Sequence, residues 1–250
     1  QAFRRYLTSH VGDHEPMNQP LGTRSLDSFR DPIRRASVDV SIVVDEGAGT
    51  SAHVGEVIES STAQLVAESV RLNGAPAFGQ FVRVETEPLP ILGVVHNTRT
   101  QSLEANRRPS AYGKSEEELR LEQPQIFELL RTHFDVFVLG YLDGTHPVLA
   151  YPPQPARIHS FVHVCSTEQT RALTATEQLL RSLLEAPGLP TDELLLATLS
   201  HALDAREPAL RQAYVLRTGK ELSRLLRDDY DRLSALVGRL KDRMNSKDSQ

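Results

Sequence analysis

Four short runs of β-branched and other apolar residues between residues 54 and 95 constrain the fold more than any other part of the chain. Each run is bounded by Gly, Pro, Asn or Ser, which favour turns and strand ends. Four such runs in about forty residues predict a coiled antiparallel sheet that closes into a small barrel. The runs cover residues 54–59, 65–68, 79–84 and 91–95.

Further apolar segments extend the predicted sheet on both sides of these runs. Residues 38–44 alternate and then run apolar, residues 134–142 form a long strand pattern, and residues 158–164 alternate cleanly. The charged stretch at 97–124 predicts a loop insertion with one short helix, for which Ser115 is a suitable N-cap.

From residue 167 onward the pattern is helical only. Helices are predicted over about 168–185, from Thr191, and from Pro208 towards the end of the chain. The predicted fold class is α+β, a small antiparallel β-barrel followed by an all-α C-terminal helical bundle. The predicted domains are an irregular segment at 1–37, a barrel at 38–165 with the charged insertion near 97–124, and a helical domain at 166–250.

Leucines recur at three- and four-residue steps along the last predicted helix. Charges of both signs are interleaved with them, as on a solvated helix face. Such a stripe packs either on the rest of the chain or on a partner in an assembly, and the pattern leaves both open. The candidate interface residues are Leu222, Leu226, Leu233, Leu236 and Leu240.

Composition narrows the class of protein. A net charge of −5 and a pI near 6.0 argue against a protein that coats nucleic acid with its whole surface. The one cysteine, Cys165, excludes an intramolecular disulfide and fits a reducing compartment. Neither a signal-peptide pattern nor an apolar run of roughly 18 residues is found, which predicts a cytoplasmic protein without membrane association. Met17 is a candidate for the native start.

The stretch 54–62, followed by a strand with Gly79, Phe81 and Val82 and by the run at 91–95, resembles the HAS-barrel. This is the small N-terminal barrel of HerA-type DNA translocases and of ATP synthase catalytic subunits. The resemblance implies a barrel that mediates ring assembly or docks a partner. In HerA-type proteins the implied partner is a nuclease of DNA end processing.

Those relatives also carry a P-loop ATPase core after the barrel. The nearest string in this chain is 217–221, Arg-Thr-Gly-Lys-Glu. A P-loop needs a glycine where Tyr214 stands and Ser or Thr where Glu221 stands, and it needs a preceding strand. ATP hydrolysis is therefore not implied for this chain.

The remaining candidate residues each have a plain structural explanation. His159 and His163 are four apart on a predicted strand, roughly 13 Å at strand rise, which is too far to share one metal ion. Cys165 is expected to be a small buried side chain. The acidic run at 228–231 is expected on a solvated helix face. The sequence thus identifies no catalytic set, metal site or cofactor.

These observations favour a non-enzymatic adaptor that docks to itself or to a nucleic-acid-processing ATPase or nuclease, through its barrel and C-terminal helices. Any association with DNA would then be indirect. The alternative is a metal-dependent nuclease or phosphohydrolase that draws carboxylates from Asp143, Glu56 or Glu68 at the barrel rim. Direct DNA binding by the barrel is a third option, which the acidic net charge disfavours.

Overall fold

The computed structural model describes residues 52–103 and 110–248, with side chains up to Arg243. The predicted irregular segment at 1–37 and the predicted strand at 38–44 lie outside the described residues. Within the described part, no helix is both long enough and apolar enough to span a membrane.

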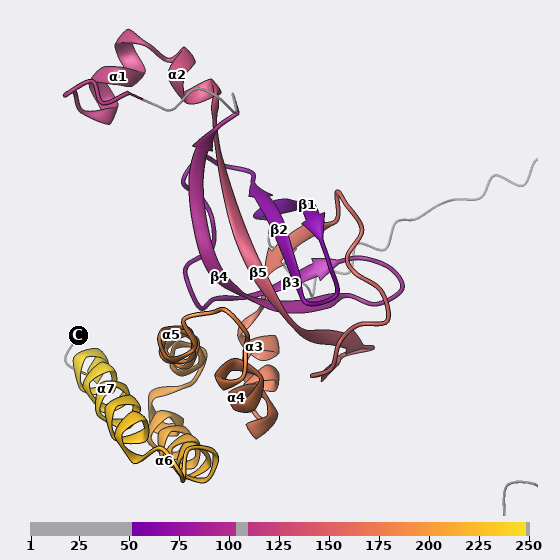
Figure 1. Ribbon diagram of the computed structural model, residues 1–250, viewed down its shortest axis with the longest axis vertical. Coiled ribbons are helices and arrows are strands. Elements are labelled where there is room, and N and C mark those ends of the chain that lie inside the picture. Colours follow the sequence, from indigo (N-terminus) through magenta and orange to yellow (C-terminus); the bar gives the residue numbers. More distant parts are fainter. Residues whose placement is uncertain (1–51, 104–109, 249–250) are drawn as a thin grey trace, which may run out of the picture. The chain divides into compact units, whose positions relative to one another are not determined.

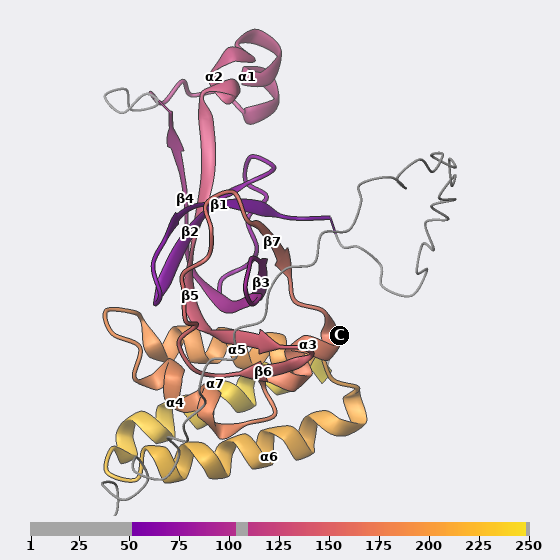
Figure 2. The same cartoon turned by 90° about the vertical axis from the view of Figure 1, so that its right-hand side faces the viewer.

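Six strands form a closed antiparallel barrel (Figures 1 and 2). Around the ring they follow the order β2, β1, β7, β3, β4 and β5, and β5 pairs back with β2 to close it. A further strand, β6 (His146–Val148), pairs with the end of β5. The closed antiparallel barrel predicted from the sequence is confirmed. Its strands are β1 (Gly55–Ser60), β2 (Gln64–Ser69), β3 (Phe81–Glu85), β4 (Ile91–Ser102), β5 (Leu130–Asp143) and β7 (Phe161–Val164).

Some barrel strands are buried on both faces, and the alternation of side chains along them sorts the buried residues into two clusters. On β5, Phe134, Val136 and Val138 belong to the cluster inside the barrel. Phe137 and Leu139, on the opposite face of the same strand, belong to a second cluster that also contains the leucines of the C-terminal helices. The continuous apolar run of β5 therefore reflects burial of both its faces.

The C-terminal part contains five helices among the described residues, where the sequence predicted three. The first predicted helix is divided because Thr176 has extended backbone angles (φ −107°, ψ 147°) and begins a new helix. The third is divided because Asp229 accepts a hydrogen bond from the backbone N–H of Arg232, as an N-cap does. The helices are α3 (Thr167–Leu173), α4 (Glu177–Leu184), α5 (Thr191–Asp204), α6 (Pro208–Leu225) and α7 (Tyr230–Asp248).

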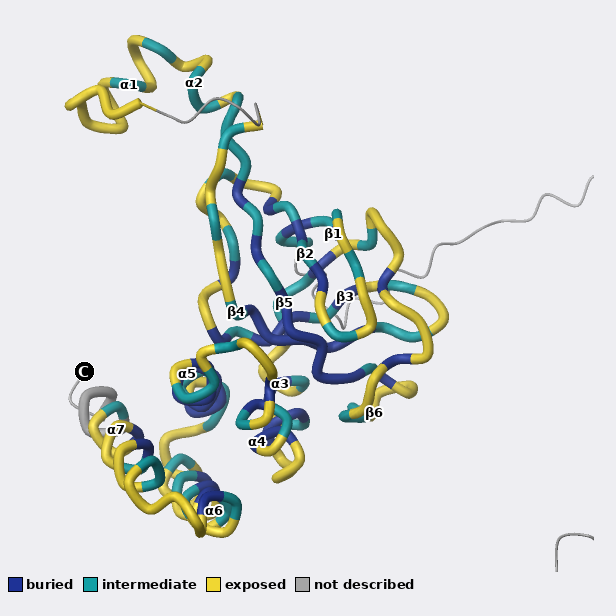
Figure 3. The backbone as a smooth tube through the Cα atoms, in the orientation of Figure 1, coloured by how far each residue is buried: buried dark blue, intermediate teal, exposed yellow. Residues whose placement is uncertain are grey.

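The helices cover part of the outside of the barrel. The backbone of Gly79, just before β3, approaches α5 so closely that an added Cβ would lie 2.5 Å from the Cβ of Ala197. A ring nitrogen of His201 on α5 lies 3.2 Å from the carbonyl oxygen of Phe78. In Figure 3, α5 is mostly buried, in agreement with its eight buried residues.

The predicted charged loop begins later than expected. β4 continues to Ser102 and pairs with β5 as far as Leu130, so residues 97–102 are strand and not loop. Thr98 and Thr100 suit a strand because they are β-branched. The helices α1 (Glu116–Glu122) and α2 (Gln125–Glu128) follow at the end of this ribbon (Figure 1). The predicted cap is confirmed, since Ser115 and Glu118 form a capping box.

Candidate docking surface on the barrel

Strand β7 presents Phe161 and His163 on the outside of the barrel and Val162 on the inside. β7 pairs with β1 on one side and with β3 on the other. Phe161 lies opposite Glu56 of β1 and opposite Glu85 of β3. Val162 is fully buried, whereas Phe161 is 44% exposed. An aromatic side chain on the outer face of a fully paired strand contributes apolar area that the barrel itself does not cover.

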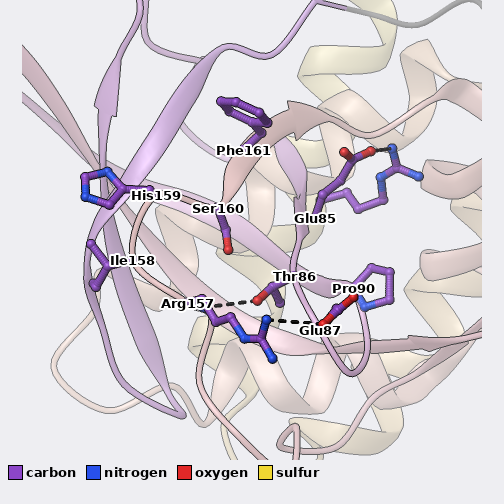
Figure 4. Close-up of a pocket in the computed structure, with 10 residues that line it drawn as sticks. Glu85, Thr86, Glu87, Pro90, Arg157, Ile158, His159, Ser160 and Phe161 are labelled. Carbon is purple, nitrogen blue, oxygen red and sulfur yellow. Dashed lines mark hydrogen bonds and ion pairs between the residues drawn. The ribbon is translucent and has the colours of Figure 1, made fainter.

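Beside Phe161 the surface is hollowed into an open pocket of about 580 Å³ (Figure 4). Strand β3, the turn between β3 and β4, and the segment 157–161 line it. Its apolar contacts come mainly from Phe161 and from Ile158, which is 49% exposed. The size of the hollow suits one or two side chains of a partner.

The charged groups around this hollow are paired with one another. Arg83 contacts Glu85 at 2.6 Å, and Arg157 contacts Glu87 at 3.2 Å. The backbone N–H of Arg157 also donates to the hydroxyl of Thr86 at 3.1 Å, as Figure 4 shows. Neutralised pairs around an apolar centre resemble the polar rim of a protein–protein contact more than a phosphate-binding groove, which needs unpaired cations.

The two histidines of this segment lie in different environments. β7 begins only at Phe161, so the predicted strand from 158 is wrong for its first three residues. His159 has a positive φ of 69° in the preceding turn and its side chain is 80% exposed, near Glu56 at 3.6 Å. His163 is on the strand, 16% exposed, with Glu85 at 3.6 Å. Among the described residues, no three His, Cys, Asp or Glu side chains are grouped so that they could hold a metal ion.

Cys165 follows β7 and is buried, as the sequence predicted. Burial raises the pKa of its thiol from 9.0 to about 12, and the nearby Arg83 only partly opposes the increase. A nucleophilic cysteine needs the opposite shift, because the thiolate is the reactive form. Cys165 is therefore a packing residue.

We expect Cys165 not to react with a thiol-specific disulfide reagent at pH 8 in the folded protein, and to react within minutes in denaturant. The folded state holds this proton more tightly than the unfolded state. The raised pKa of Cys165 therefore contributes to the free energy of unfolding below pH 9, and this contribution is lost as the pH rises from 9 to about 12. The absorbance of the released thiolate measures the reaction, with Cys165→Ser as the control. Rapid labelling of the native protein would contradict the burial.

The three carboxylates proposed for a metal-dependent reaction do not meet in one place. Glu56 and Glu68 are opposite one another on β1 and β2. Glu68 is engaged by Arg131 at 3.2 Å and lies 3.4 Å from His133. Asp143 is ten residues beyond His133 on β5, roughly 33 Å of strand away, where it pairs with His146. Asp143 therefore cannot share a metal ion with Glu56 or Glu68, whereas Glu56 and Glu68 are themselves cross-strand neighbours.

The leucine stripe lies inside the folded chain. Leu222, Leu226, Leu236 and Leu240 are between 1% and 8% exposed, and Leu233 packs against them. The interface assigned to these residues stays a prediction, but a partner could reach them only by separating α6 and α7 from the other helices. The P-loop-like string at 217–221 lies within α6, so it is helical and not a phosphate-binding loop.

A comparison with known protein families identifies the type of barrel. A family model described as the HAS barrel domain matches residues 54–144. The match covers β1 to β5, and β7, which completes the ring, lies beyond its end. The resemblance inferred from the residues is thereby confirmed for this segment, and HAS barrels are modules of larger assemblies. No curated protein matches the chain.

Sequence reasoning did not single out the hollow beside Phe161. The available signal was the alternation at 161–164, in which Phe161 occupies an outward position next to the inward Val162. The pairing of Arg157 with Glu87 joins residues 70 positions apart in the chain, which no local pattern predicts.

Proposed function

We propose that this chain is a non-enzymatic adaptor that joins a larger assembly by docking its barrel to a protein, either a second copy of itself or a nucleic-acid-processing ATPase or nuclease. The match of the HAS barrel domain to a closed barrel is the observation that carries the proposal. The hollow beside Phe161 supports a protein partner, because its apolar side chains are flanked by two ion pairs.

The barrel surface is a better docking element than the leucine stripe. Phe161 and Ile158 are about half exposed in the folded chain, whereas Leu222 and Leu236 are at most 2% exposed. Contact through the barrel requires no rearrangement, while contact through the leucines requires loss of the helical core. Preformed surfaces bind with a smaller entropic cost.

The groups considered for catalysis support the same proposal. Glu68 is held by Arg131, and the pKa of Cys165 is shifted away from reactivity. We expect no metal-dependent cleavage of DNA, RNA or a phosphomonoester by the purified full-length chain with Mg²⁺ or Mn²⁺. Cleavage that is lost in Glu68→Gln would instead support the nuclease alternative.

The test of docking compares two surface substitutions in the full-length chain. Phe161→Asp places a charge at the centre of the proposed contact and is expected to weaken association about 30-fold, the effect of losing one hot-spot residue. Val70→Asp is the matched control, because Val70 is 57% exposed and lies outside the hollow. Self-association is measured by light scattering, and partner binding by quantitative crosslinking in native cells.

The two variants should have the same thermal midpoint, since both change exposed residues. Equal loss of association in both variants, or none in Phe161→Asp, would remove the hollow as the docking surface. A strictly monomeric wild-type protein that crosslinks to no protein would overturn the adaptor function itself.

A further inference from the structure

Four arginine side chains gather where the ends of α3 and α5 meet α6. The side chains of Arg206 and Arg217 both bind Thr174, the C-cap of α3, at 2.7 and 3.1 Å. The other two bind backbone carbonyls at the end of α5, those of Ala205 and Leu203. We call the four residues the arginine cluster. They are Arg171 on α3, Arg206 between α5 and α6, and Arg211 and Arg217 on α6.

Two of these guanidinium groups are held in place by an aromatic ring. The guanidinium carbon of Arg206 lies 3.7 Å from the centroid of the Tyr214 ring, and that of Arg217 lies 5.5 Å from it. Arg206 also donates to the carbonyl oxygen of Ala202 at 2.6 Å. These contacts fix both groups before any ligand arrives, so little side-chain entropy would be lost on binding.

The positive charges of the cluster are not neutralised by ion pairs. None of the four arginines pairs with a carboxylate within the residues that the structure describes. Three acidic side chains stand close by in the sequence, and all are exposed: Glu168, Asp204 and Glu207. Burial lowers the pKa of the Arg206 guanidinium, and the positive charges of Arg217 and Arg171 lower it further. The clustered charges therefore repel one another, and a bound anion would relieve that repulsion.

A structural role accounts for only part of the hydrogen-bonding capacity of the cluster. Arginines near a helix C-terminus bind its last carbonyls and interact favourably with the helix dipole, and α5 ends here. Each guanidinium has five N–H donors. Within the described chain, however, Arg171 and Arg211 use only Nε, and Arg217 uses only Nη2. Arg171 and Arg217 are exposed and Arg211 is half-buried, so the unused donors can be reached from solvent.

We propose that the arginine cluster binds a phosphate-bearing ligand, with Arg171, Arg211 and Arg217 as the direct contacts and Arg206 as a supporting charge. The planar fork of a guanidinium group matches two phosphate oxygens, and several such groups together suit a ligand with more than one negative charge. The inference goes beyond the adaptor function and does not depend on it.

The surroundings of the cluster restrict recognition to the phosphate groups. The hollow lined by Arg217 and Tyr214 has a volume of only about 20 Å³, which is too small for a base or a sugar. Tyr214 is 6% exposed, so its ring is not a platform on which a base could stack. The phosphate is therefore either free, as in pyrophosphate, or carried on the backbone of a nucleic acid that is bound without regard to its sequence.

The test is calorimetric titration of the full-length chain with pyrophosphate at constant ionic strength. Saturable binding is expected. Arg171→Gln and Arg217→Gln should each weaken it about tenfold, because each removes charge-assisted hydrogen bonds to the ligand. Arg217→Lys keeps the charge and loses the planar fork, so it should weaken binding about threefold. Circular dichroism shows whether each variant is folded.

The matched control is Arg181→Gln, which removes the same charge from a different place. Arg181 is exposed on α4 and lies 3.7 Å from Glu185, so its charge already has a partner. This substitution should leave the affinity for pyrophosphate unchanged. Because the control and Arg217→Gln have the same net charge, any difference between them comes from the position of the arginine.

Three results would overturn the proposal: no saturable binding of pyrophosphate, equal weakening by Arg181→Gln and Arg217→Gln, or undiminished binding by Arg217→Lys. A second ligand identifies the source of the phosphate. Tighter binding of a single-stranded oligonucleotide of about ten nucleotides than of pyrophosphate supports a nucleic-acid backbone, and the reverse order supports a free phosphate compound.

Discussion

Replacement of Leu222 by aspartate is expected to unfold the protein, whereas replacement of Leu216 by aspartate, on the same helix, is expected to leave it folded. Leu222 is 1% exposed in the cluster that joins the helices to the barrel, and Leu216 is 61% exposed. Loss of the buried leucine leaves a cavity, and a carboxylate in that place must be desolvated. Together these should cost about 4 kcal/mol or more, a large part of the 5–15 kcal/mol that stabilises a typical domain.

Urea unfolding followed by circular dichroism measures this difference. The pair also separates the two explanations that the leucine stripe allowed. If the stripe forms an interface between chains, Leu222→Asp should give a folded monomer of unchanged stability. That result would contradict the intramolecular packing, as would equal destabilisation by the two substitutions.

The sequence predicted the barrel well because its strands have strong local signals. The runs at 54–59, 65–68 and 91–95 each contain β-branched residues, and they correspond to β1, β2 and the first part of β4 in the closed barrel. Closure itself depends on β2 pairing with β5, which joins Glu68 to His133 across the chain. Antiparallel pairing between distant strands has no local signature, so the order around the ring could not be predicted.

Element boundaries were less predictable where two explanations of the same residues compete. The charged stretch at 97–124 predicted a loop from its composition. Polar residues such as Thr100 and Gln101 nevertheless form strand, because their backbones pair with β5 and their side chains do not have to be buried in a core. Asp229 belongs to an acidic run that suits a solvated face. It also caps α7, and the cap is visible only once the break after α6 is known.

The hollow beside Phe161 illustrates what a sequence cannot indicate about a site. Its lining joins β3 and the turn after it to residues 157–161, about seventy positions later in the chain, so their proximity depends on the pairing of β3 with β7. Neither Phe161 nor Arg157 stands in a motif, and only the fold places them beside Glu87.

Replacement of Phe134 by alanine is expected to destabilise the protein by about 3–5 kcal/mol, the usual cost of removing a fully buried phenylalanine. Phe134 is 0% exposed in the cluster inside the barrel. Its ring lies where a side chain on Gly55 would begin, since an added Cβ would be 2.8 Å from a ring carbon. The glycine at the start of β1 thus provides room for the ring, and no neighbouring side chain can move in to fill the cavity from that side.

The control is Phe161→Ala, which removes the same side chain from the outer face of β7. Phe161 is 44% exposed, so its loss should cost less than about 1 kcal/mol. Chemical denaturation of both variants gives the comparison, and proteolysis of the native state reports whether the barrel opens. Equal costs for the two substitutions would mean that Phe134 does not fill a closed interior, and the ring of strands would then not be the packed barrel on which the proposed docking surface depends.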